Sequence, residues 1–226
     1  MASSSRPGRR LGRRFFDRPT RRVARELLGA SLTVIGPDGA RSVRLVETEA
    51  YVAHDPASHA FAGETRRNRS MFGPPGTLYV YRIHQVVCAN LVTRSGEAVL
   101  LRAGALPHGD PLSASGPGRL CRALGLTIED DGVDAARGNR VRVYARRRPP
   151  ARVVVGPRVG IRRAAEARLR YAIAGEVAVS RPRPVGWGAI GASPRRSRAD
   201  GARRRSRRRR RRPSGGGRRA GRTGGR

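Results

Sequence analysis

The stretch Arg44-Leu-Val-Glu-Thr-Glu-Ala-Tyr51 has the pattern of a buried β-strand, yet it contains two carboxylates and a tyrosine. Side chains alternate between the two faces of a regular strand, so Glu47, Glu49 and Tyr51 share one face. Carboxylates beside an aromatic ring, in a strongly basic chain, indicate acid–base chemistry on a flat substrate with an anionic backbone.

Short strands and a few helices surround this stretch. Residues 17–29 predict a helix, because Pro19 stands near its start and Gly29 marks its end. A second short helix is expected at 116–125 and a polar loop at 53–75. The expected strands are 31–35, 42–52, 77–83, 86–93, 97–103, 141–145, 153–155 and 172–179. Strands and helices do not alternate regularly, so we expect an α+β single domain with a mostly antiparallel curved sheet and flanking helices.

The composition divides the chain into a basic disordered arm at 1–14, a folded domain at 15–184 and a tail at 185–226. The tail holds 16 of the arginines and one acid, Asp200. Such a segment cannot bury enough apolar surface to offset its ordering entropy, so we expect disorder. It either binds nucleic acid without sequence preference or is a non-functional extension encoded by GC-rich DNA; both interpretations stay open.

The charge of the chain indicates which class of partner it binds. Its 226 residues carry a net charge of +33, and all 49 basic residues are arginine. GC-rich codon usage accounts for the missing lysines but not for the scarcity of acids, so a polyanion is the better explanation. Arginine suits this partner because its planar guanidinium donates pairs of hydrogen bonds to phosphates and base edges.

The same composition excludes several chemistries. Without lysine, a lyase that forms an imine with its substrate would have to use the α-amine of the chain. A P-loop is excluded because it needs a lysine to bind phosphate. Cys88 and Cys121 are isolated from each other and from the histidines, which predicts no metal, no cofactor and a reducing compartment. No apolar run approaches membrane-spanning length. We therefore expect a cytoplasmic protein with no membrane association.

Eight sequence runs, in order, resemble the alkyladenine (3-methyladenine) DNA glycosylases. They span nearly all of residues 15–184. The runs are 46–51, 55–61, 65–73, 76–81, 88–90, 98–103, 116–121 and 157–161.

The resemblance implies a monofunctional DNA glycosylase of base excision repair. It would flip an alkylated or deaminated purine out of double-stranded DNA and hydrolyse the N-glycosidic bond without a metal, leaving an abasic site. Its lesions would be of the 3-methyladenine, 7-methylguanine, hypoxanthine and ethenoadenine class. We expect a bacterial, nucleoid-associated monomer. The alternative is a non-enzymatic arginine-rich nucleic-acid-binding protein, which explains the charge but gives no reason for Glu49, Tyr51 and His59.

The resemblance also assigns the catalytic groups. Glu49 matches the carboxylate that activates water, and Arg102 matches an arginine that holds the water and a nearby phosphate. The backbone carbonyl of Val159 corresponds to a further water-holding group, and Glu47 is a supporting acid. Without the resemblance, a structural ion pair is the better explanation of Glu49, and a solvated strand end is the alternative for Arg102.

The substrate base pocket is assigned in the same way. Tyr51, His59 and Tyr81 match aromatic walls on which a flipped purine stacks, and Asn90 matches the residue that disfavours guanine through its amino group. A methylated purine is cationic, so the ring faces also attract it by cation–π interaction. The tyrosines are otherwise explained as core packing and Asn90 as a buried side chain bonded to backbone.

The DNA-inserting β-hairpin departs from the family pattern. Relatives carry a wedging tyrosine at the tip, whereas this chain reads Tyr81-Arg-Ile-His-Gln-Val-Val-Cys-Ala-Asn90 and is one residue shorter. Counting from Tyr81 puts His84 at the wedge position, and counting back from Asn90 puts Ile83 there. Either side chain can unstack a base step, so the sequence leaves both open as the intercalating residue.

Overall fold

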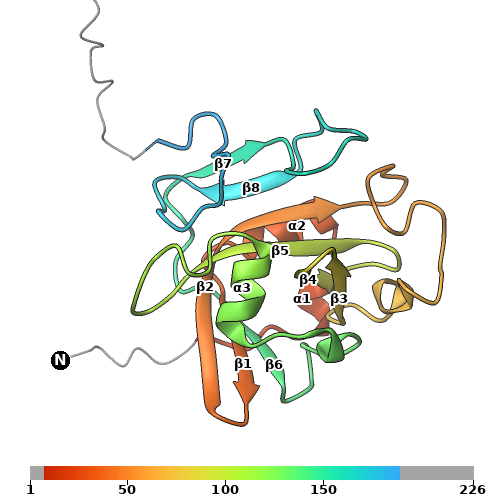
Figure 1. Ribbon diagram of the computed structural model, residues 1–226, viewed down its shortest axis with the longest axis horizontal. Coiled ribbons are helices and arrows are strands. Elements are labelled where there is room, and N and C mark those ends of the chain that lie inside the picture. Colours follow the sequence, from red (N-terminus) through yellow and green to blue (C-terminus); the bar gives the residue numbers. More distant parts are fainter. Residues whose placement is uncertain (1–7, 189–226) are drawn as a thin grey trace, which may run out of the picture. The chain divides into compact units, whose positions relative to one another are not determined.

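The computed structural model describes residues 8–188. Eight strands form one antiparallel sheet in the order β3-β4-β5-β2-β1-β6, with β8 beside β2 and β7 beside β8. The strands are β1 (Ser31–Gly36), β2 (Gly39–Tyr51), β3 (Leu78–Ile83), β4 (Val86–Val92), β5 (Ala98–Ala105), β6 (Val141–Tyr144), β7 (Val153–Gly156) and β8 (Arg170–Ile173). Figure 1 shows β1 and β6 near one end of β2 and β7 and β8 beside its other end.

In the described part of the chain, residues 8–188, five short helices connect and cover these strands. They are α1 (Arg13–Phe16), α2 (Thr20–Glu26), α3 (Pro117–Leu124) and the 3-10 helices η1 (Arg69–Phe72) and η2 (Ile128–Asp130). The helix α2 packs on β2, where the Thr48 hydroxyl donates a hydrogen bond to the carbonyl of Ala24 over 2.9 Å. The helix α3 packs against β4 and β5. The predicted α+β class and single curved antiparallel sheet are confirmed.

The long strand β2 is central because it pairs with three other strands, β1, β5 and β8. Its first half pairs with β1, while residues 47–49 lie between β5 and β8. The register with β5 shifts twice between Leu45 and Thr48, which marks a β-bulge that bends the strand. Glu47 lies at this irregularity and Glu49 follows it, and both carboxylates reach the guanidinium of Arg102. The predicted shared face of the two acids is therefore confirmed.

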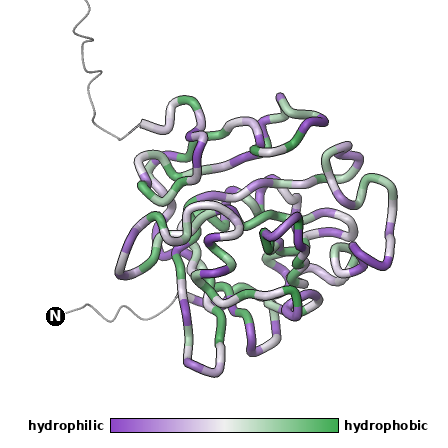
Figure 2. The backbone as a smooth tube through the Cα atoms, viewed as in Figure 1, coloured by the Kyte–Doolittle hydropathy of each residue, from purple (hydrophilic) through white to green (hydrophobic). Residues whose placement is uncertain are grey.

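Apolar side chains from all these elements form the core. Figure 2 shows the hydrophobic segments mainly inside the body and hydrophilic ones mainly in outlying turns. The largest fully buried apolar side chains are Phe16, Leu27, Leu28, Leu32, Leu45, Leu78, Leu91, Leu101, Leu120 and Leu124. Both cysteines are free and buried. Among residues 8–188, no helix is long and apolar enough to cross a membrane.

Three boundaries differ from those expected. The expected helix 17–29 is wrong in extent, because the observed helix α2 spans only Thr20–Glu26. The separate helix α1 ends at Phe16, and α2 begins directly after Pro19, which has no N–H to continue a preceding helical turn. The expected strand 172–179 is wrong beyond Ile173, because a turn with Gly175 at φ +78° follows β8. Residues 8–14, expected in the arm, reach the sheet, where the N–H of Leu11 bonds the carbonyl of Val143 over 2.8 Å.

Candidate active site

A cavity of about 470 Å³ opens where β2, β3, β4 and β5 meet the loops that follow β2 and β7. This volume falls in the usual range of small-molecule sites. Of the nine residues predicted for the site, eight line this cavity, and Glu49 is buried behind it in contact with three of them, Tyr51, Arg102 and Val159. The eight are Tyr51, His59, Tyr81, Ile83, His84, Asn90, Arg102 and Val159.

Glu49 is fully buried behind the residues that line the pocket and is held by three of them. Its Oε1 accepts a hydrogen bond from the N–H of Val159 at 2.9 Å and lies 3.4 Å from Nη1 of Arg102. Its Oε2 accepts a hydrogen bond from the Tyr51 hydroxyl at 3.3 Å. Burial raises the pKa of Glu49, and Arg102 and the Val159 N–H act in the opposite direction.

Arg102 bridges the two carboxylates of β2. Its Nε donates to Glu47 Oε1 at 3.1 Å, and its Nη1 faces Glu49. Glu47 also accepts from Nε of Arg170 at 2.6 Å and from the N–H of Ser180 at 2.7 Å. A buried carboxylate is costly unless fully paired, and Glu47 meets that requirement. The supporting role predicted for Glu47 has this geometric basis.

A second buried ion pair fixes the loop that carries Val159. Arg158 binds both oxygens of Asp55 and donates to the carbonyl of Ala50 at 3.2 Å. Its guanidinium carbon also lies 4.6 Å from the centre of the Tyr51 ring. The pair therefore holds a pocket wall and the Glu49 hydrogen-bond donor in one rigid unit. Both residues fall in the recognised sequence runs, yet sequence reasoning assigned them no role.

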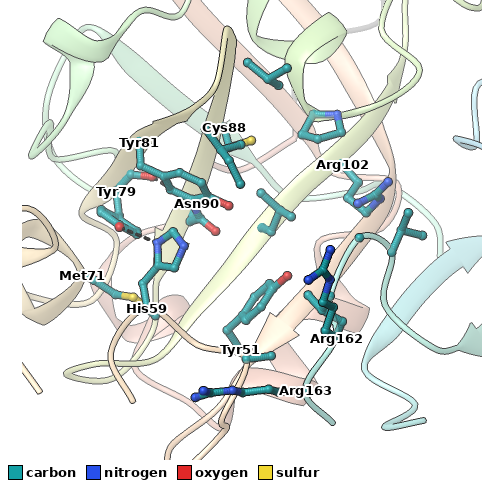
Figure 3. Close-up of a pocket in the computed structure, with 18 of the residues that line it drawn as sticks. Tyr51, His59, Met71, Tyr79, Tyr81, Cys88, Asn90, Arg102, Arg162 and Arg163 are labelled. Carbon is teal, nitrogen blue, oxygen red and sulfur yellow. Dashed lines mark hydrogen bonds between the residues drawn. The ribbon is translucent and has the colours of Figure 1, made fainter. Parts of the chain in front are cut away.

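The aromatic walls lie on opposite sides of the pocket. Figure 3 shows His59 beside Tyr81 and Tyr79, with Tyr51 approaching from the other direction. The His59 and Tyr81 ring centres are 4.4 Å apart, and Nδ1 of His59 lies 2.9 Å from the Tyr79 hydroxyl. Partial burial lowers the pKa of His59 and so favours its neutral ring. Tyr79, which orients His59, was not predicted.

The loop that carries His59 is held by Asn68. The Asn68 amide donates to the carbonyls of His59 and Gly63 at 2.8 and 3.0 Å, and its oxygen accepts from the N–H of Thr65 at 2.6 Å. Asn90 is buried and donates to the Tyr79 carbonyl at 3.1 Å while it lines the pocket. Asn90 thus combines the backbone-bonding role and the pocket position that the sequence left open.

The β3–β4 hairpin ends in a two-residue turn at the mouth of the pocket. Ile83 pairs with Val86, and His84 in the turn has a left-handed backbone with φ +51°. Ile83 is 52% exposed and Val86 is 41% exposed. Both candidates for the wedge, Ile83 and His84, line the pocket.

Two arginines at the mouth were also missed. Arg162 and Arg163 are exposed, follow the Val159 segment and line the same cavity (Figure 3). An arginine pair in a basic chain carries little signal in sequence alone, because only the fold brings it to the pocket. Within residues 8–188, no group of three or more potential metal ligands gathers.

This fold and this site define a class of nucleic-acid enzyme. A basic α+β domain with an aromatic pocket over a buried, ion-paired carboxylate is suited to cleaving a bond to a planar base. The model of the methylpurine-DNA glycosylase family matches residues 14–177. The chain belongs to the methylpurine-DNA glycosylase family, and it is therefore a DNA-repair hydrolase that acts on the N-glycosidic bond in DNA.

Similar proteins support this membership. A Rhizobium etli protein is 44% identical over 186 residues, which cover 75% of this chain and 88% of the relative. A Rhodopseudomonas palustris (strain BisB5) protein is 42% identical over 199 residues, covering 80% and 95%. A Methanoculleus marisnigri protein is 42% identical over 187 residues, covering 74% and 96%. All three are named "Putative 3-methyladenine DNA glycosylase".

Proposed function

We propose that this enzyme is a monofunctional glycosylase that flips a damaged purine from double-stranded DNA into the aromatic pocket and hydrolyses its N-glycosidic bond. Glu49 activates the attacking water. The observation that carries the proposal is that Glu49, which is buried, contacts Arg102 and the Val159 N–H, and both of these residues line the pocket. The product is an abasic site, without strand cleavage.

The chemistry needs a carboxylate beside the sugar. N-glycosidic cleavage develops positive charge on the sugar, which the Glu49 carboxylate stabilises while it accepts a proton from water. Its raised pKa makes it a better proton acceptor than an exposed glutamate. Arg102 keeps it ionised and orients it, and the carbonyl of Val159 is the further group that holds the water.

The pocket walls select the base. Tyr51, His59 and Tyr81 present ring faces on which a flipped purine regains the stacking that it loses in the duplex. Cationic bases such as 3-methyladenine and 7-methylguanine leave readily, whereas neutral hypoxanthine and ethenoadenine need protonation as they leave. Asn90 disfavours guanine because guanine carries an additional amino group. The proposed lesion class therefore includes alkylated and deaminated purines.

The hairpin delivers the base. The exposed tip at Ile83 and His84 borders the pocket, so a side chain inserted into the duplex would stand beside the vacated base position. We propose that a single copy of the chain performs this step, because every group assigned to the site comes from one domain.

The test is single-turnover excision from duplexes that each contain one lesion: 3-methyladenine, 7-methylguanine, hypoxanthine or ethenoadenine. Glu49→Gln keeps the size of the side chain but cannot accept the proton, so the rate should fall by at least about a hundredfold. The exposed Glu166→Gln is the matched control and should keep the native rate. Native activity in Glu49→Gln would remove the proposed mechanism.

A further inference from the structure

The chain beyond β8 returns to the active site. Residues 178–182, here called the C-terminal strap, follow the turn at Gly175, and Ala178, Val179 and Ser180 are buried. The family match ends at residue 177, so the strap lies outside it. Its burial places a segment beyond the matched region within reach of the catalytic groups.

Ser180 contacts both charged groups behind Glu49. Its hydroxyl accepts hydrogen bonds from Nη2 and Nε of Arg102 at 3.1 and 3.3 Å and donates to Glu47 Oε1 at 3.0 Å. Its N–H donates to the other oxygen of Glu47 at 2.7 Å. A single residue of the strap therefore ties Arg102 to its buried counter-ion.

The backbone of the strap is itself held. Nη1 and Nη2 of Arg170 donate to the carbonyls of Pro182 and Ser180 at 2.8 and 3.0 Å, while its Nε binds Glu47. Glu47, Arg102, Arg170 and Ser180 are each at most 6% exposed. In such a low-dielectric setting, a polar network whose hydrogen bonds are all satisfied is rigid and holds its side chains in one defined geometry.

This network restricts the guanidinium of Arg102. Its Nε and Nη2 are engaged by Glu47 and Ser180, which leaves Nη1 directed at Glu49 Oε1. Misplacing a catalytic group by about 1 Å is enough to slow a reaction substantially. We propose that the C-terminal strap is a positioning element, in which Ser180, together with Glu47, aligns Arg102 on Glu49. This inference rests on the proposed catalytic role of those two residues.

The test begins with Ser180→Ala, which removes the hydroxyl but keeps the N–H that binds Glu47. Single-turnover excision at saturating enzyme should slow about tenfold, with DNA affinity unchanged, because a hydrogen bond to a charged group is lost. Ser180→Thr keeps the hydroxyl and should keep the rate. Ser113→Ala removes an exposed loop hydroxyl and is the matched control.

Two readouts separate positioning from a general loss of structure. First, a looser Arg102 opposes protonation of Glu49 less, so the acid limb of the pH–rate profile should move to higher pH. The midpoint of that limb does not depend on the fraction of folded enzyme. Second, Ser180→Ala should add nothing in the Arg102→Gln background, because both changes remove the same interaction.

The outcomes are distinct. A native rate and unmoved acid limb in Ser180→Ala, or losses that multiply in the double variant, would overturn the positioning role of the strap. A native rate in Arg102→Gln would instead overturn the proposed function of Arg102 itself.

Discussion

Two opposing influences act on Glu49. Its complete burial raises the pKa of the carboxyl, whereas Arg102 at 3.4 Å and the Val159 N–H favour the ionised form. The net direction is upward, so the carboxylate is a stronger base than that of an exposed glutamate. The residue that the sequence singled out thus depends on neighbours from two other segments for its charge state.

A pH dependence follows from this balance. Glu49 must be ionised to accept a proton, so the excision rate should rise with pH through a midpoint above the ordinary glutamate pKa. Arg102→Gln removes the nearest cation, which raises the pKa of Glu49 further and should move that midpoint upward. Single-turnover rates across pH, on a lesion that is itself neutral, measure the shift. A midpoint that stays in place would show that Arg102 does not set the charge of Glu49.

At the scale of elements, the sequence predicted most strands within two residues. Alternating apolar residues and glycine-bounded segments located β1 to β7, and the helix at 116–125 ends at Gly125 in a left-handed conformation with φ +70°. The end of β8 was missed because Ala174, Val177, Ala178 and Val179 are apolar, although this segment forms a turn and the start of the strap rather than a strand. An apolar sequence pattern does not by itself distinguish a buried strand from a buried irregular segment.

The hairpin supplies a prediction at this scale. Ile83 is the exposed apolar side chain of the pair, and inserting it between bases hides apolar surface, so we expect Ile83→Ala to slow excision from duplex DNA more than His84→Ala. The defect should shrink when the lesion is mispaired, because a weakly paired base is easier to flip. Val177→Ala, at a 51% exposed site outside the pocket, is the matched control. A larger loss in His84→Ala would assign the wedge to that residue.

At the scale of the whole molecule, the tail from residue 185 onward is rich in arginine but contains none of the predicted site residues. The site groups all fall within the described residues, whereas most of the proposed tail lies outside them. The tail proposed from 185 onward includes Trp187, which packs against the core and accepts a hydrogen bond from the Gly175 N–H at 3.0 Å. A truncation that tests the tail should therefore keep Trp187.

Deleting residues 189–226 should weaken binding to undamaged and damaged duplex alike. The slope of log affinity against log salt should become shallower, because fewer phosphate contacts release counter-ions. The excision rate at saturating enzyme should not change, since the pocket is intact. Titrations at several salt concentrations, with single-turnover kinetics alongside, check both statements. An unchanged salt slope would favour the tail as a non-functional extension.

The sequence alone determined the strand pattern and the identity of the main site residues. Glu49 and Tyr51 are two residues apart on one strand and therefore share a face, and the ordered runs resemble a known family. The convergence of those residues on one pocket was inferred from that resemblance, because a sequence alone contains no distances between residues.

Only the tertiary structure decided how the site is held. Arg170, Ser180 and Arg158 meet Glu47 and Asp55 across separations of 103 to 133 residues. Their types carry no signal in a chain with 49 basic residues. The physical reason is that a buried carboxylate requires partners but does not specify from which segment they come, and the folded sheet makes that choice.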